Sequence, residues 1–356
     1  MPLPSRTAVL TAAETLLIAA AGGVAFTMLR IPAGLVSGSV LAVAVAALAG
    51  RPTRVPTWIA RVCFVLIGIL LGAIVTPEML HGMATWPASI AVLAVATIAM
   101  MSATTSYLRY AHGWDWNSAF LGASPGAMAQ VISLSAEFRA DLRGIAIVQV
   151  MRVLLVTIGL PGGLALFGLA AGGMIAVPGP AGGSSPAEIA TLIATSTGLA
   201  VTLSWLRFPG GLLFGSMAGS AILHGTGLVH AVLPWWLGSS AVIVVGAVAG
   251  SRFHNTSVRT VIDYLGAALG SFGVSVVVAA LFATIVMTFL PFRPADVVIA
   301  FAPGSQDQMM LLALALHLDP VYVGAHHLAR WLVVTLSIAI FSKTAPRPQS
   351  PRDQGR

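Results

Sequence analysis

Charged residues are scarce in this sequence. Asp, Glu, Lys and Arg make up 8% of the 356 residues, about a third of the share in an average soluble domain, whereas hydrophobic residues make up 57%. The mean hydropathy is +0.93. So few polar side chains cannot cover the surface of a soluble globular protein. The composition therefore predicts an integral membrane protein.

Cysteine is almost absent as well. Cys63 stands alone in an apolar segment, which excludes a disulfide framework or a cysteine metal site within one chain. The eight histidines are scattered apart from the adjacent His326 and His327, and no H-x-x-x-H pair offers ligands for copper or iron. No nucleotide-binding motif is present. We therefore expect no metal, no cofactor and no enzymatic activity.

Basic residues outnumber acidic ones, 18 to 11, and the sequence pI is about 10.7. These Lys and Arg residues are spread over short loops and form no basic stripe, so we expect no nucleic-acid partner. Their placement suits orientation in a bilayer instead. Apolar runs long enough to cross about 30 Å of hydrocarbon recur along the chain, for example at 8–29 and 86–108. The first run has a counterpart at 187–206, so we interpret it as a retained span and not a signal peptide.

The chain repeats itself at an offset of 177 to 178 residues. "RIPAGLVSGS" at 30–39 matches "RFPGGLLFGS" at 207–216, and a G-x-x-x-G pair at 68 and 72 matches one at 246 and 250. Shared Arg, Pro and Asp positions in one register predict a duplicated unit. We expect a first membrane repeat at 1–176, an extracytoplasmic linker at 177–186, a second repeat at 187–342 and a disordered cytoplasmic tail at 343–356.

Each repeat contains six apolar segments, and the fifth lies at 117–138 or 296–317. Whether this segment crosses the membrane decides whether the two repeats have the same or opposite orientations. If these two segments enter the membrane and return, the loops place 14 Lys and Arg on the side of the N-terminus and 2 opposite; if they cross, the division is 10 and 6. The positive-inside rule favours the first arrangement. The predicted fold is an all-α polytopic membrane protein with two inverted repeats, each of about five transmembrane helices plus one re-entrant or broken helix. Both termini then lie in the cytoplasm.

The fifth segments carry "SPGAMAQ" at 124–130 and "APGSQDQ" at 302–308. Pro-Gly breaks a helix, and backbone groups freed at membrane depth must be buried in protein or face water. We expect the two breaks to meet near the midplane at the repeat interface, where a helix N-terminus could bind an anionic group. A simple kink or loop mouth is the alternative. The candidate binding residues here are Pro125, Gly126, Gln130, Pro303, Gly304, Gln306, Asp307 and Gln308.

Arg152 and Arg330 lie at matching positions inside the sixth segments, with Gln149 and His327 one turn before them. An arginine inside a membrane helix costs roughly 3 kcal/mol or more and normally faces a cavity or a partner. These four side chains could hold a carboxylate, sulfate or phosphate. Alternatively, each arginine ties the sixth segment to free carbonyls of the fifth, or pairs with Asp307.

His326 and His327 are candidates for a proton relay, with simple packing as the alternative. Asp141 and Asp319 begin the sixth segments and are predicted N-caps. For the G-x-x-x-G pairs we expect a role in close helix packing.

The chain resembles the AbrB family of bacterial inner-membrane proteins, often labelled ammonia monooxygenase. The resemblance rests on "FAPGSQDQMMLLALALHLDPVYVGAHHLARWLVV" at 301–334 and on a more degenerate copy at 122–156. The family pattern has an acidic residue where this chain has Gln130 and Gln308. The resemblance implies a transporter-like architecture in the inner (plasma) membrane and, through one member, a link to regulation of gene expression.

The residues favour a secondary transporter or permease of a small solute, with a weak preference for an anion. A membrane protein that regulates gene expression through a partner is the alternative. Ammonia oxidation is not expected, because the sequence has no cluster of ligands for the metal that this reaction needs. Beyond the lipid bilayer and an unidentified solute, the sequence is compatible with a homo-oligomer.

Overall fold

A computed structural model describes residues 6–75, 79, 83–125, 131, 134–135, 137–169 and 185–344. Its regular structure is helical, and the described residues contain no β-strand. Within these ranges, seven helices are long and apolar enough to cross a membrane. The prediction of an all-α polytopic membrane protein is confirmed. Most of the predicted linker and nearly all of the predicted tail, with Gly126 and Gln130, lie outside the described residues.

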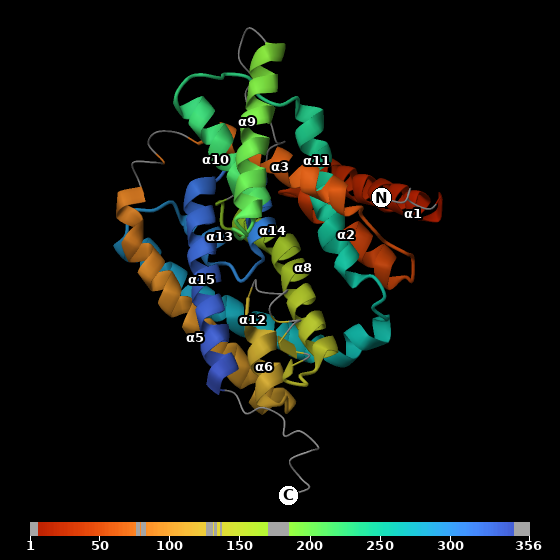
Figure 1. Cartoon of the computed structure of the whole chain (residues 1–356). Helices are drawn as coiled ribbons and strands as arrows, with labels where there is room; N and C mark the ends of the chain where they lie inside the picture. The colour runs from red at the N-terminus through yellow and green to blue at the C-terminus, as the bar shows by residue number, and fades with distance from the viewer. Residues whose placement is uncertain are drawn as a thin grey trace, which may run out of the picture.

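The helices of the two halves follow the same order along the chain (Figure 1). The first half contains α1 (Arg6–Met28), α2 (Gly34–Leu48), α3 (Thr57–Ala73), η1 (Met83–Thr85), α5 (Trp86–His112), α6 (Trp116–Ala123) and α8 (Leu142–Leu166). The second half contains α9 (Pro186–Trp205), α10 (Gly211–Gly225), α11 (Trp235–Gly250), η2 (Ser251–Phe253), α12 (Val258–Phe289), α13 (Pro294–Phe301), α14 (Gln306–Ala315) and α15 (Pro320–Thr344).

Several of the described α-helices are shorter than a full span of about 20 residues, among them α11 with 16 and the pieces of the fifth segments, α6, α13 and α14, with 8 to 10. α2 and α10 have 15 residues each and α3 has 17. The number of crossings in each half therefore remains a prediction, although a helix occupies every predicted apolar segment. α8, α13, α14 and α15 occupy the middle of Figure 1, with α1, α2 and α11 on one side and α5 on the other.

Contacts between the halves come in reciprocal pairs. α2 packs on α11 and α10 packs on α3; α5 packs on α15 and α12 packs on α8; and α5 packs on α12, its own counterpart. When the same contact occurs twice with the partners exchanged, the two units are related by a pseudo-two-fold axis. The packing therefore agrees with the repeat in the sequence.

Glycines at the predicted G-x-x-x-G positions lie at the contacts of α3 with α10 and of α11 with α2. A Cβ on Gly68 would collide with the Leu213 carbonyl oxygen and the Ser216 hydroxyl of α10. A Cβ on Gly246 would collide in the same way with the hydroxyl of Ser39 on α2, the counterpart of Ser216. Helix backbones therefore approach closely at these points, which confirms the packing role predicted for both pairs.

We expect Gly72→Ala to destabilise the protein. The added methyl group would meet the Met217 carbonyl oxygen and would lie 2.5 Å from the Ser220 Cβ, so α3 and α10 must separate. Overpacking of this kind costs about 1–3 kcal/mol, which corresponds to a fall in Tm of roughly 3–10 °C. Gly273→Ala is the matched control, because no atom lies within 4 Å of that Cβ position. Equal melting temperatures of the two variants in detergent would contradict this packing.

Candidate functional site

The fifth segment of the second half is broken at the predicted Pro-Gly. α13 ends at Phe301 and α14 begins at Gln306. The residues from Phe301 to Gly304 are buried, so the break lies inside the protein. In the first half, α6 ends at Ala123, Ser124 is extended and Pro125 is buried. The interruption predicted at Pro303 and Gly304 is confirmed.

Two arginines bind the carbonyl groups at these helix ends. The last carbonyls of any helix lack an intrahelical donor and need another partner. Arg152 donates through Nη1 to the Ala123 oxygen at 3.3 Å and through Nη2 to the Ser124 oxygen at 3.2 Å. Arg330 donates through Nη2 to the Ala300 oxygen at 2.7 Å and through Nη1 to the Ala302 oxygen. Each guanidinium thus caps the C-terminus of a half-helix, where a positive charge also suits the helix dipole.

The residues one turn earlier make the same kind of contact. Gln149 donates to the Leu121 oxygen at 3.1 Å, and His327 Nε2 lies 3.2 Å from the Ile299 oxygen. Because a carbonyl only accepts, His327 must carry its proton on Nε2. Gln149, Arg152, His327 and Arg330 are all 3–5% exposed. Of the alternatives for the arginines, the structure shows the tie to free carbonyls of the fifth segment.

Hydrogen bonds to side-chain oxygens fix the starts of α8 and α15. Asp141 Oδ1 accepts from the Arg143 and Gly144 amides, and Asp319 Oδ1 accepts from the amides of residues 321 and 322. Both predicted N-caps are confirmed. The Asp141 amide donates to Ser118 Oγ at 2.8 Å, and the Asp319 amide donates to Asp296 Oδ1 at 2.9 Å. These bonds tie the start of α8 to the start of α6, and the start of α15 to the start of α13. The arginines tie the same helices to the C-terminal ends of α6 and α13.

The adjacent histidines serve different partners. His326 Nδ1 lies 2.8 Å from the Tyr322 carbonyl oxygen, so it carries the proton, and Nε2 lies 2.8 Å from Ser89 Oγ on α5. The ring also lies beside Trp86. His326 therefore joins α15 to α5, whereas His327 faces the break. A role of these histidines in proton transfer remains a prediction.

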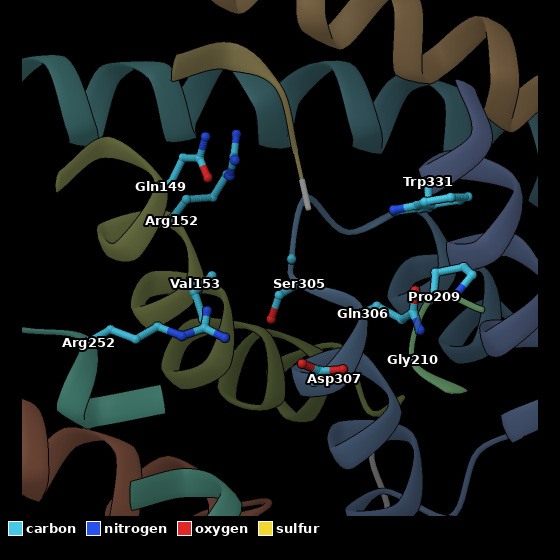
Figure 2. A pocket seen from close by; sticks show the side chains of 11 residues that line it. Gln149, Arg152, Val153, Pro209, Gly210, Arg252, Ser305, Gln306, Asp307 and Trp331 are labelled. Atoms are coloured by element: carbon cyan, nitrogen blue, oxygen red, sulfur yellow. The ribbon is translucent and has the colours of Figure 1, made fainter. Parts of the chain in front are cut away.

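A cavity of about 250 Å³ lies next to the break in the second half (Figure 2). Helices of both halves contribute to it. Five predicted residues line this cavity: Gln149, Arg152, Gly304, Gln306 and Asp307. Pro303, Gln308, His326, His327 and Arg330 do not line it. The lining is completed by Val153, Pro209, Gly210, Arg252, Ser305 and Trp331.

Arg252 is the main residue that sequence reasoning missed. It lies in η2, directly after α11. In the sequence it is one of the loop arginines that indicate the orientation of the chain in the bilayer. Its counterpart 178 positions earlier is Ile74. An arginine where the other half has an apolar residue is the feature of the sequence that could have identified it. Gly210 belongs to the repeated "RFPGG" motif. It has a φ of +65°, and a Cβ there would collide with Gln306 Nε2.

Several polar groups at the cavity have no hydrogen-bond partner among the described residues. Within the part of the chain that the structure describes, neither the Arg252 guanidinium nor the Asp307 carboxylate makes a hydrogen bond or an ion pair. Ser305 is the N-cap of α14, but its side chain makes no capping bond and its Oγ lacks a partner. These groups can bind a small polar solute.

Comparison with known proteins gives the family. Residues 35–345 match the model described as "Transition state regulatory protein AbrB". The chain belongs to the AbrB family. It is 24% identical over 343 residues to the Escherichia coli (strain K12) protein named "Putative regulator AbrB", covering 91% of this chain and 94% of that protein. It is also 26% identical over 289 residues to the "Uncharacterized protein YhjN" of Bacillus subtilis (strain 168), covering 76% and 74%. The resemblance found in the motifs is confirmed.

We expect Arg330→Gln to lower Tm by roughly 5 °C or more. The substitution leaves the Ala300 and Ala302 carbonyls without their charged donor, and each unpaired buried group costs about 1–3 kcal/mol. Arg259→Gln, at an exposed position on α12, is the control and should melt like the parent. Thermal unfolding of the purified variants in detergent measures the difference. If Arg330→Gln melted like the control, the guanidinium would not hold the helix end.

Proposed function

We propose that this AbrB-family protein is a secondary transporter or permease of a small solute. The observation that carries the proposal is the buried break between α13 and α14, which opens onto a cavity of about 250 Å³ lined by both halves of the chain. Many secondary transporters bind their substrates at broken helices between inverted repeats. Because the sequence has no nucleotide-binding motif, an ion gradient or the solute gradient would drive the movement.

The charges around the cavity favour a solute with an anionic group. Arg152 and Arg252 contribute two positive charges against the single carboxylate of Asp307. The N-terminus of α14 adds the positive end of a helix dipole and backbone N–H groups without intrahelical acceptors. A carboxylate is therefore attracted to this site.

The proposed location is the inner (plasma) membrane, with both termini in the cytoplasm. This orientation follows from the distribution of Lys and Arg and is tested by labelling loops from either side. The cavity is lined by Pro209 and Arg252, which belong to two loops on the proposed cytoplasmic side. In this orientation the site is reached from the cytoplasm. The proposed partners of the protein are the lipid bilayer, the solute and a second copy of the chain.

A regulatory role is the second candidate, because the family model and the E. coli relative are named as regulators. A membrane regulator would act through a protein partner at its cytoplasmic loops. It would change gene expression without moving a solute. The two candidates are therefore separated by whether the purified protein alone produces a flux.

We expect the purified full-length protein in proteoliposomes to give saturable uptake of a solute from a panel of small carboxylates, amino acids, phosphate, sulfate and amines. Arg252→Gln should reduce this uptake about tenfold or more, because it removes a charged hydrogen-bond donor from the cavity. Arg259→Gln should transport like the parent. If no compound in the panel entered faster than into protein-free liposomes, the regulatory candidate would replace this one.

A further inference from the structure

We propose that the cavity binds a zwitterionic solute that carries one carboxylate and one ammonium group, the chemistry of an α-amino acid. This inference rests on the proposed transport site and specifies its substrate class. The observation behind it is a pair of opposite charges, Arg252 and Asp307, that face the same cavity without pairing.

The two charges come from different elements. Arg252 lies in η2, and Asp307 lies in the first turn of α14. In Figure 2 the guanidinium and the carboxylate both point into the space between these elements. Both residues are half-buried, and both line the cavity. The ion pairs found among the described residues are Arg51 with Glu14 and Arg293 with Asp296, so the charged atoms of Arg252 and Asp307 are more than 4.0 Å apart.

Two facing charges of opposite sign would normally form a direct ion pair when they leave bulk water. Here the cavity separates them, so each is available to a ligand. A zwitterion offers its carboxylate to Arg252 and its ammonium to Asp307, and both charges of the site are then paired. A plain carboxylate would leave Asp307 unpaired, and a plain amine would leave Arg252 unpaired. The cavity therefore selects against ligands that carry only one of the two charges.

Other lining groups agree with a small amino acid. Ser305 Oγ, which has no partner among the residues that the structure describes, supplies a further hydrogen bond. Arg152 adds positive charge, but two of its donors already serve the carbonyls of Ala123 and Ser124. The volume of about 250 Å³ is below the range of roughly 300–1,000 Å³ typical of pockets for drug-sized ligands. The site accordingly suits a compact solute.

Matched probes test the two charges separately. L-alanine, propionate and ethylamine differ only in which charged groups they carry, and L-leucine, 4-methylpentanoate and 3-methylbutylamine form a larger set of the same kind. Binding of each probe to the full-length protein in nanodiscs would be measured by calorimetry. For at least one set we expect the parent to bind the amino acid about tenfold or more tightly than either single-charge analogue.

Substitutions should then shift this preference in opposite directions. Asp307→Asn is expected to weaken amino-acid binding about tenfold while leaving carboxylate binding no weaker, because only the ammonium loses its partner. Arg252→Gln should weaken the amino acid and the carboxylate but not the amine. Asp263→Asn and Arg259→Gln, at exposed positions on α12, are the matched controls and should bind like the parent.

Three results would overturn the inference. The first is that, in both sets, the carboxylate or the amine binds the parent as tightly as its amino acid. The second is amino-acid binding that survives both Asp307→Asn and Arg252→Gln. The third is no binding of any amino acid to the parent. These results leave the transport proposal intact if another solute enters proteoliposomes, whereas amino-acid binding without flux would support this site and overturn transport.

Discussion

The structure depends on the arginine that caps each broken helix. Hydrocarbon offers no water to an exposed carbonyl, so a helix that stops inside a membrane protein needs internal donors at its end. Arg152 supplies them to residues 123 and 124, and Arg330 supplies them to residues 300 and 302. The planar guanidinium reaches two carbonyls at once, which a lysine ammonium does less well. Without these caps the break beside the cavity would be too costly to keep.

The symmetry of the molecule makes its departures from symmetry informative. The caps, the N-cap aspartates and the glycine contacts each occur twice at matching positions. Most residues that line the cavity, in contrast, differ from their counterparts: Arg252 stands where the first half has Ile74, and Gly210 stands where it has Ala33. The contacts that occur in both halves can stabilise the fold. The residues that differ between the halves can form a binding site that occurs once.

Much of the fold could be predicted from the sequence because its causes are local. The length of the apolar segments, the Pro-Gly break and the N-cap aspartates each determine the structure of their own segment. The G-x-x-x-G pairs act at a helix interface that the internal repeat indicates. The role of Arg152 and Arg330 could not be decided in this way, since a buried arginine suits either an anion or a carbonyl. Arg252 was missed because the positive-inside rule already explains an arginine in a loop of a membrane protein. Only the cavity that Arg252 lines together with residues of α14 gives it another explanation.

The central claim is that the two halves enter the membrane in opposite directions, so that their broken helices meet at one interface. Arg51 and Leu228 test it most directly: they are exposed, lie between α2 and α3 and between α10 and α11, and occupy repeat positions 177 residues apart. Cys63, the only cysteine, would first be replaced by alanine. A membrane-impermeant maleimide should then label Leu228→Cys in intact cells and Arg51→Cys only after permeabilisation. Labelling of both positions from the same side would contradict the inverted arrangement.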